Sequence, residues 1–419
     1  MADNLDVYLV GTMIGQLSRH GQEIDFDYGE VLPEHMLSAS MPATCRHHSG
    51  PVVGNWLDNL LPDNDAVRQR WATTFGVRNR AFDLLGRVGA DCAGAVQIMP
   101  EGVGPDQSGS LEPVTVDEIA DQIRQLRRDP DAWVRSGVLG HWSLAGAQGK
   151  FALTRDANGQ WFQPSGRAAS THILKVGVAG LPDSDVAEFV TMRAARLLGL
   201  PVPSVEIMDF AGETAMVVTR FDRITADDGI RRVHQEDMCQ ALGVNRNNKY
   251  QADGGPSAGQ IADLLVSLVD PRHRLDAVEN FARAQVFNWL MMGTDAHAKN
   301  YALMYVGSRV LLAPFYDLTS AALLPGADVH AMHFADALAM KFGDEYRFRK
   351  VDRGCFSQAA NQLHVDSGML RDTAISYRDA IPDAVASAIA LLPEATAVRV
   401  RAPMSEQIAS RVAQLAEFD

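Results

Sequence analysis

The sequence predicts an α+β fold made of a small N-terminal α+β unit, a strand-rich middle region and a mainly helical C-terminal region. Three observations predict it. Short strand-like and helix-like runs alternate through the first half of the chain. Residues 101–110 are rich in Gly and Pro and indicate a linker. With 419 residues and 47% hydrophobic content, the chain is long enough for more than one core.

Composition excludes several classes of protein. The N-terminus lacks a basic stretch followed by an apolar run, and no window approaches the roughly twenty apolar residues that cross a bilayer, so we expect a cytoplasmic protein without a membrane partner. Four cysteines without C-x-x-C pairing favour reduced thiols over disulfides or zinc. A net charge of −14 argues against direct DNA binding by the chain as a whole.

The first region, residues 1–108, is expected to be an accessory domain. Alternating apolar residues predict one strand over 5–10 that continues through 11–16, and a second over 24–28. Residues 55–75 predict helices broken at Pro62-Asp63, and 83–86 continue the helical pattern before a strand at 96–98.

The second region, residues 109–221, contains a loop of small residues. After a helix over 116–126, this loop leads into strands at 151–154, 161–162 and 171–176. Small residues let backbone N–H groups approach phosphate oxygens, so the loop is a candidate anion-binding nest, with an ordinary hairpin turn as the alternative. Its candidate residues are Ala145, Gly146, Ala147, Gln148, Gly149 and Lys150.

A lysine and a glutamate follow this loop in an order that kinases use. Lys175 lies within an otherwise apolar strand, where an unpaired ammonium group would be costly, so we expect it to face phosphate or a carboxylate. Glu188 lies in the first turn of a helix predicted over 185–198 and is the candidate partner, although a helix-dipole role explains it as well. Strands at 205–208 and 215–219 then lead to a link between two lobes at 218–221.

The third region, residues 222–419, carries the densest polar chemistry. A helical pattern over 281–291 ends at Gly293-Thr294, and Asp295, His297, Lys299 and Asn300 follow at once. Strands at 302–305 and 310–312 form a predicted hairpin that returns Asp317 towards Asp295. The Asp295-to-Asn300 spacing equals that of a kinase catalytic loop, and Asn300 and Asp317 offer oxygen ligands for Mg²⁺. His297 and Lys299 are further candidate catalytic residues, because they add donors near the transferred phosphate. A polar loop capped by Asp and Asn is the alternative.

Taken in order, these segments resemble the HipA family of bacterial serine/threonine kinases, the toxins of HipBA-type toxin–antitoxin modules. The similarity runs from about Ser143 to the low 340s, and the N-terminal region has the size of the family's accessory domain. The segments that carry it are SLAGAQGK, THILK, RFDR, HQEDMCQALG, TDAHAKN and FYDLTSA. The resemblance implies a two-lobed, protein-kinase-like α+β fold with a helical C-terminal lobe.

The resemblance also implies roles for individual residues. Residues 145–150 would cover the phosphates of ATP, Lys175 would contact them, and Thr219, Arg220 and Phe221 would form the adenine hinge. Asp295 would be the catalytic base, and His297, Ala298, Lys299, Asn300, Tyr316 and Asp317 would complete the nucleotide and Mg²⁺ site. Ser143 matches the serine that family members autophosphorylate. Gly149 stands where the family often has Glu, and Thr219 where it often has an acidic residue.

The expected function is therefore ATP- and Mg²⁺-dependent phosphorylation of a protein hydroxyl by a type II toxin. By resemblance, its partners would be a DNA-binding helix-turn-helix antitoxin similar to HipB, with DNA contacted only through it, and a translation-related substrate such as an aminoacyl-tRNA synthetase. Two alternatives remain open: a small-molecule or lipid kinase, and a nucleotide-binding corepressor that acts with a DNA-binding antitoxin.

Overall fold

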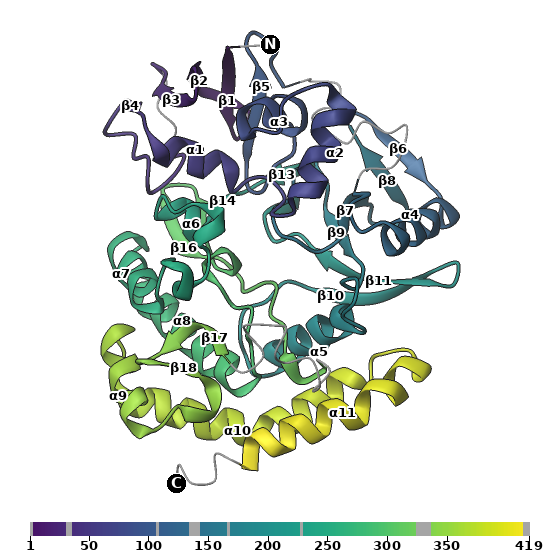
Figure 1. Ribbon diagram of the computed structural model, residues 1–419, viewed down its shortest axis with the longest axis vertical. Coiled ribbons are helices and arrows are strands. Elements are labelled where there is room, and N and C mark those ends of the chain that lie inside the picture. Colours follow the sequence, from purple (N-terminus) through teal and green to yellow (C-terminus); the bar gives the residue numbers. More distant parts are fainter. Residues whose placement is uncertain are drawn as a thin grey trace. The chain divides into compact units, whose positions relative to one another are not determined.

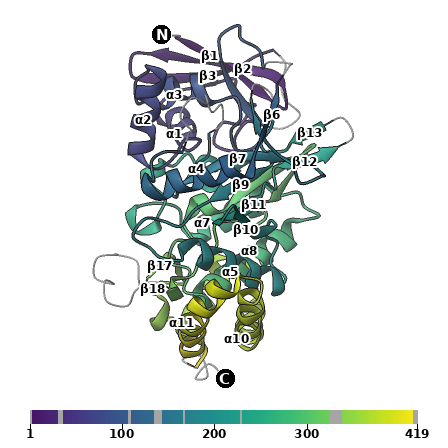
Figure 2. The same ribbon diagram turned by 90° about the vertical axis from the view of Figure 1, so that its right-hand side faces the viewer.

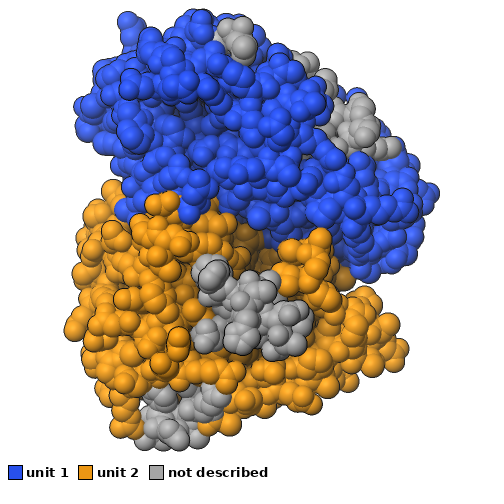
Figure 3. All heavy atoms as spheres, viewed as in Figure 1, with its two compact units in different colours: residues 1–176, 208–247, 303–309 blue, residues 177–207, 248–302, 310–419 orange. Residues whose placement is uncertain are grey.

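A computed structural model describes residues 3–30, 36–105, 109–133, 143–165, 168–226, 229–323 and 337–413. The chain forms two compact units (Figure 3). Unit 1 consists of residues 1–176, 208–247 and 303–309, and unit 2 of residues 177–207, 248–302 and 310–419. Within the described part of the chain, no helix has the length and apolar character needed to cross a membrane.

Unit 1 begins with a five-stranded sheet in the order β4-β3-β2-β1-β5 (Figure 1). Its strands are β1 (Asn4–Leu9), β2 (Thr12–His20), β3 (Glu23–Tyr28), β4 (His47–His48) and β5 (Val96–Pro100). The prediction of one continuous strand over residues 5–16 is wrong, because β1 and β2 pair as an antiparallel hairpin. Val10 and Gly11 turn the chain with φ of 50° and 79°. A two-residue hairpin turn requires positive φ angles, which valine rarely adopts. The residue types therefore give no signal of a turn at Val10.

Three helices follow the first strands: α1 (Pro51–Asp58), α2 (Asp65–Phe75) and α3 (Ala81–Val88). The predicted break at Pro62-Asp63 is confirmed, since α1 ends before it and α2 begins after it. Asn64 caps α2, where its side chain accepts hydrogen bonds from the N–H groups of Ala66 and Val67. The turn between the two helices, residues 59–64, is called the α1–α2 turn below.

A second sheet has six strands in the order β10-β11-β9-β7-β8-β6. They are β6 (Leu111–Val114), β7 (Lys150–Arg155), β8 (Trp161–Pro164), β9 (His172–Lys175), β10 (Val205–Phe210) and β11 (Glu213–Thr219), and α4 (Val116–Arg128) packs against β11. Strands β7 and β9 are antiparallel, and their register places Lys150 opposite Lys175. The sheet therefore brings the end of the small-residue loop beside the strand lysine.

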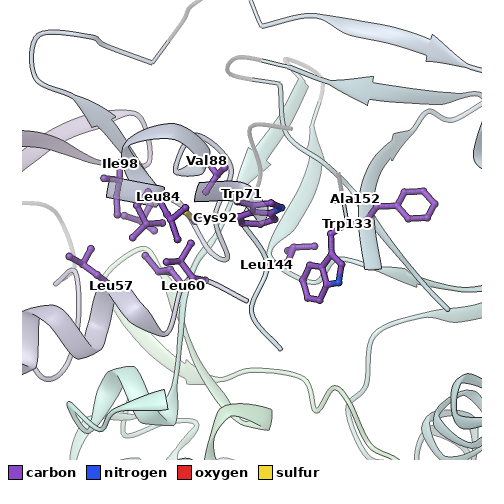
Figure 4. Close-up of a cluster of buried hydrophobic side chains, with 14 of the residues drawn as sticks. Leu57, Leu60, Trp71, Leu84, Val88, Cys92, Ile98, Trp133, Leu144 and Ala152 are labelled. Atoms are coloured by element: carbon purple, nitrogen blue, oxygen red, sulfur yellow. The ribbon is translucent and has the colours of Figure 1, made fainter. Parts of the chain in front are cut away.

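One hydrophobic core runs through unit 1 (Figure 4). Leu57 and Leu60 belong to the same cluster of buried side chains as Trp133, Leu144 and Ala152, which lie near or in the second sheet. The buried core is therefore continuous across the linker at residues 101–110. The division of the chain at residues 108 and 221 remains a prediction, since the two compact units partition it differently.

Unit 2 is mainly helical. Its helices are α5 (Ser184–Leu197), α7 (Ala258–Leu268), α8 (Arg274–Leu290), α9 (Arg353–Gln362), α10 (Ser367–Ile389) and α11 (Glu394–Ala413). Helix α10 packs against α5, α8, α9 and α11 (Figures 1 and 2). Amphipathic patterns over residues 382–392 and 405–418 predict C-terminal helices, but the first of these helices does not begin at Pro382. The side chain of Asp366 caps α10, and Pro382 lies inside this helix. Residues 414–418 of the helix expected over 405–418 lie outside the described residues.

Short elements complete the fold: β12 (Arg223–Ala226), β13 (Gly229–Arg232), β14 (His234–Asp237), α6 (Met238–Ala241), β15 (Ala302–Val306), β16 (Arg309–Leu312), β17 (Ala337–Phe342) and β18 (Glu345–Arg347). Strand β15 lies between β14 and β16 in a three-stranded sheet, which confirms the predicted hairpin around Gly307-Ser308. Asp237 caps α6 through a reciprocal pair of hydrogen bonds with Gln240. The α+β class is confirmed.

Candidate active site

Residues 293–301, the segment that contains Asp295 and Asn300, follow the end of helix α8. After α8, Met292 has a φ of 54°, and the N–H of Gly293 donates to the carbonyl of Asn288 at 2.7 Å. A Cβ atom on Gly293 would lie 2.9 Å from Oδ1 of Asn288, so a larger residue would force a shift here. On the far side, the Tyr301 hydroxyl accepts hydrogen bonds from Asn288 at 2.8 Å and Gln285 at 3.0 Å. Buried anchors thus hold both ends of residues 293–301.

Asp295 presents its carboxylate from this segment. Its side chain is 52% exposed, whereas that of His297 is only 6% exposed, with Nε2 of His297 at 3.9 Å from the carboxylate. The hydroxyl of Tyr250 donates to Oδ1 of Asp295, and the Tyr250 ring meets the His297 ring edge-on at 4.9 Å between centroids. The carboxylate is therefore accessible and also oriented, as a group that accepts a proton from a substrate hydroxyl must be.

Asn300 is tied to the same segment. Its amide nitrogen donates to the backbone carbonyl of Asp295 at 2.8 Å, so the amide oxygen is the atom of this side chain that can ligate a cation. The hydroxyl of Tyr316 donates to the carbonyl of Lys299 at 2.7 Å, which places the residue before Asp317 against this segment. Asp317 has a φ of 53°, a conformation that aspartate tolerates better than most residues.

These residues offer oxygen ligands to a metal ion. Among the described residues, no group of three or more His, Cys, Asp or Glu side chains could hold a metal by itself. Magnesium is commonly held by one or two protein oxygens together with substrate phosphates and water. The amide oxygen of Asn300 and the carboxylate of Asp317 are of the right chemical type for that binding mode.

The small-residue loop lies in unit 1 and is held by the α1–α2 turn. Ser143 is fully buried, and its hydroxyl donates to the carbonyl of Leu60 at 2.7 Å. The N–H of Asp63 donates to the carbonyl of Gly146 at 2.9 Å. At the end of the loop, Nζ of Lys150 donates to the carbonyl of Ala145 at 2.7 Å and lies 5.5 Å from the centre of the Trp133 ring. The Lys150 side chain therefore bonds the end of the loop to its first residue, Ala145.

The remainder of the loop is joined to β9. The carbonyl of Gly149 accepts from the N–H of Val176 at 3.2 Å, and the side chain of Gln148 donates to the carbonyl of Val176 at 2.8 Å. Lys175 is 4% exposed. It belongs to unit 1 and Glu188 to unit 2, so their pairing remains a prediction.

The hinge segment contains a buried arginine. The N–H of Arg220 donates to the carbonyl of Thr171 at 2.9 Å, and its guanidinium donates to Asp222 at 2.8 and 3.0 Å. Burial alone would lower the pKa of Arg220, but the carboxylates of Asp222 and Asp91 raise that pKa above its usual value. The Arg220 amide and side chain thus bond to protein groups, and the role of residues 219–221 in holding adenine remains a prediction.

The sequence patterns did not indicate Tyr250, which contacts Asp295, or Asp91, which contacts residues near the loop and the hinge. Tyr250 lies 45 positions before the aspartate that it contacts, and no local spacing relates them. Asp91 precedes Cys92 in a stretch without a recognisable pattern. It is 3% exposed and contacts Ser143 and Ser170 as well as the arginines beside the hinge.

The chain is similar to known proteins over most of its length. Family models described as HipA N-terminal domain and HipA-like C-terminal domain match residues 5–99 and 142–388. The chain is 34% identical over 397 residues to the putative kinase Y4mE of Sinorhizobium fredii, with 91% of each chain covered. It is 30% identical over 374 residues to the serine/threonine-protein kinase toxin HipA of Shewanella oneidensis, covering 86% of this chain and 81% of that one.

A solved structure is similar over nearly the whole length. It is the complex of HipA, HipB and operator DNA from Shewanella oneidensis MR-1, which matches with a TM-score of 0.79 and 26% sequence identity. The match covers 98% of this chain and 95% of that one.

Proposed function

This chain belongs to the HipA family and is a kinase, and we propose on that basis that it is the toxin of a type II toxin–antitoxin module. The proposed reaction is transfer of the γ-phosphoryl group of ATP to a serine or threonine hydroxyl of a protein. Mg²⁺ would neutralise charge that develops on the transferred group. The observation that carries the proposal is the oriented, exposed Asp295 carboxylate with Asn300 and Tyr316 tied to the same segment.

Each residue has a proposed role. Asp295 accepts the proton of the substrate hydroxyl, and the Tyr250 hydroxyl orients its carboxylate. Asn300 and Asp317 would hold Mg²⁺. His297 and Lys299 donate near the transferred phosphate and, with Ala298 and Tyr316, line the nucleotide site. Residues 145–150 and Lys175 bind the phosphates, Glu188 positions Lys175, and Thr219, Arg220 and Phe221 hold the adenine. Donors and a cation around the phosphates stabilise the negative charge of the transition state.

Ser143 is the proposed site of autophosphorylation. Its hydroxyl is buried and donates to the carbonyl of Leu60, so this bond must open before the oxygen can accept a phosphoryl group. A phosphorylated serine carries about −1.5 to −2 charges and cannot donate that bond. Modification therefore disfavours the buried position of Ser143 and removes the loop from its place over ATP. We expect mass spectrometry to find the phosphate on wild-type protein and not on Asp295→Asn.

The proposed partner is a HipB-like helix-turn-helix antitoxin. The similar structure is a complex of HipA with HipB and operator DNA, which supports this choice. The net charge of −14 supports DNA contact through the antitoxin rather than by this chain. A translation-related protein in the cytoplasm, such as an aminoacyl-tRNA synthetase, is the proposed substrate.

Incubation of the purified protein with labelled ATP, Mg²⁺ and a cell lysate tests the function. We expect labelled protein bands, and we expect Asp295→Asn and Asp317→Asn each to leave less than about one per cent of the activity. Asp379→Asn, which changes an exposed carboxylate on α10, is the control and should label normally. Label in small molecules or lipids alone would favour the alternative kinase class, and retained activity in both variants would overturn the assignment.

A further inference from the structure

Asp91 is buried between the two parts of unit 1 that are proposed to bind ATP. On one side, its backbone carbonyl accepts the N–H of Ser143 at 2.9 Å. Its Oδ2 accepts the hydroxyl of Ser170 at 2.6 Å and the Ser170 N–H at 3.1 Å. Ser143 lies two residues before the small-residue loop, and Ser170 lies two residues before β9, the strand that ends at Lys175. Asp91 therefore contacts the chain just before each of the two segments proposed to hold the phosphates.

On its other side, the same carboxylate contacts arginines of the hinge region. Oδ1 accepts from Arg223 at 2.8 Å and from Arg232 at 3.1 Å, and Oδ2 lies 3.7 Å from Arg220. The guanidinium of Arg220 also donates to the hydroxyl of Ser170 at 2.8 Å. Ser170 thus connects the carboxylate with the hinge arginine by two hydrogen bonds.

The group around Asp91 brings buried charges of both signs together. We define the Asp91 cluster as Asp91, Ser170, Arg220, Asp222, Arg223 and Arg232. It joins two carboxylates to three guanidinium groups, and the Asp91, Arg220 and Arg223 side chains are at most 4% exposed. Burial alone would raise the pKa of Asp91, but the guanidinium groups of Arg223, Arg220 and Arg232 hold that pKa well below its usual range. Asp91 is ionised, and its loss would leave buried guanidinium groups poorly compensated.

Backbone contacts join the same turn to the hinge. The carbonyl of Cys92 accepts from Arg220 at 3.0 Å and from Arg223 at 2.9 Å. The N–H of Gly94 donates to Asp222 at 2.7 Å. A Cβ atom on Gly94, whose φ is 75°, would lie 2.6 Å from the backbone nitrogen of Gln235, so this close approach requires glycine. Residues 91–94 therefore have a fixed position against the hinge region.

We propose that Asp91 is a positioning residue for ATP, through which the N-terminal domain sets the relative placement of the small-residue loop, β9 and the hinge. The proposal rests on the proposed function, because these segments are the ones assigned to ATP. Asp91 itself touches neither nucleotide nor substrate. It acts through Ser143 and Ser170 on one side and through the RFDR arginines Arg220 and Arg223 on the other.

Asp91→Asn tests this role, with Asp83→Asn as its matched control. Asp83 is also a buried aspartate of the N-terminal domain, and its carboxylate also binds two arginines, Arg19 at 2.6 Å and Arg78 at 3.0 Å. Both variants remove one buried charge and keep the side-chain shape, so both should lower thermal stability. Only Asp91→Asn should weaken binding of a non-hydrolysable ATP analogue with Mg²⁺, by about tenfold, since it loses charge-assisted bonds that position the site.

A second pair of variants, which removes a hydroxyl group and no charge, tests the proposal if Asp91→Asn does not fold. Ser170→Ala removes the hydroxyl between Asp91 and Arg220 and should raise the Kd of the analogue in the same direction by a smaller factor. Ser38→Ala is its control, because Ser38 is equally buried and donates to another buried carboxylate, Glu236, at 2.5 Å. Ser38→Ala should leave the Kd unchanged.

Calorimetric Kd values and unfolding temperatures of wild type and the four variants decide the proposal. It is supported if Kd rises in Asp91→Asn and Ser170→Ala but not in their controls. It is overturned if wild type binds the analogue and folded Asp91→Asn or Ser170→Ala binds it equally well, or if each control weakens binding as much as its partner. Wild type that binds no nucleotide would overturn the proposed function itself, which is a separate result.

Discussion

At the scale of single residues, Tyr250 offers a direct test of how Asp295 is oriented. Its hydroxyl donates to Oδ1 of Asp295. We expect Tyr250→Phe to lower kcat about fivefold with little change in the KM for ATP, because one hydrogen bond contributes about 1 kcal/mol and this one acts on the proposed base. Phosphoryl-transfer rates at varied ATP concentration measure both constants.

Tyr346→Phe is the control for that variant. Tyr346 also belongs to unit 2, and its ring lies 5.2 Å from Nζ of Lys341, in a contact that phenylalanine can keep. We expect wild-type kcat from it. An unchanged kcat in Tyr250→Phe would mean that the tyrosine does not orient the reacting carboxylate.

Sequence patterns identify residues most directly where their spacing is local. Asp295, His297 and Asn300 follow one another after a helix end, and the Asn300 amide bonds to the Asp295 carbonyl. Tyr250 and Asp91 reach their partners through the tertiary fold: Asp91 lies 132 positions before Arg223. No propensity or period relates such residues, so they emerge only when the chain is folded.

At the scale of elements, local signals predicted most helices and strands, and they failed where a backbone preference was overridden. Valine at Val10 adopts a positive φ in a hairpin turn, and Pro382 lies within a helix that Asp366 had already capped. Proline normally disfavours a helix interior, and the amphipathic pattern over 382–392 indicates a helix that starts at Pro382. Here the packing of α10 against α5, α8, α9 and α11 outweighs that local cost.

The two glycines of the small-residue loop differ in the space that an added side chain would find. Gly146 has a φ of 98°, and a Cβ atom there would lie 2.6 Å from Nζ of Lys150. At Gly149 the nearest atom would lie at 3.4 Å, an ordinary contact. We expect Gly146→Ala to cost about 1–2 kcal/mol of stability and to raise the KM for ATP, because it strains the backbone and displaces the Lys150 ammonium from the Ala145 carbonyl.

Gly149→Ala is the matched control within the same loop, and we expect near wild-type stability and KM from it. Thermal unfolding and ATP titrations of the two variants make the comparison. Equal behaviour of the two alanine variants would show that the loop conformation seen here does not matter for ATP.

At the scale of the whole molecule, the sequence predicted the kinase-like class, and its division of the chain at residues 108 and 221 remains a prediction. A composition change at residues 101–110 indicated a linker, whereas buried side chains on both sides of it belong to one core. Linker composition reports local flexibility, and core continuity depends on contacts between segments distant in sequence. The same continuity supports the inference that the N-terminal domain acts on the ATP-binding segments.

The residues proposed for phosphate binding belong to unit 1, and those proposed for the base and Mg²⁺ belong to unit 2. If both sets serve one nucleotide, a saturating ATP analogue with Mg²⁺ should slow amide hydrogen exchange at residues 143–150 and also at residues 295–300. At about 100 times Kd, binding adds about 2.7 kcal/mol, enough to slow exchange about a hundredfold wherever opening requires release of the ligand.

Strands β2 and β3 in unit 1 and helix α11 in unit 2 serve as internal controls, since no nucleotide role is proposed for them, and their exchange should change little. Lys175→Ala should abolish the protection of both segments at the same analogue concentration, because phosphate binding contributes to the whole affinity. Protection confined to one unit would contradict the assignment of the other set of residues to ATP. If both segments remain protected in Lys175→Ala, Lys175 does not bind the nucleotide. The assignment of the other residues to ATP would stand.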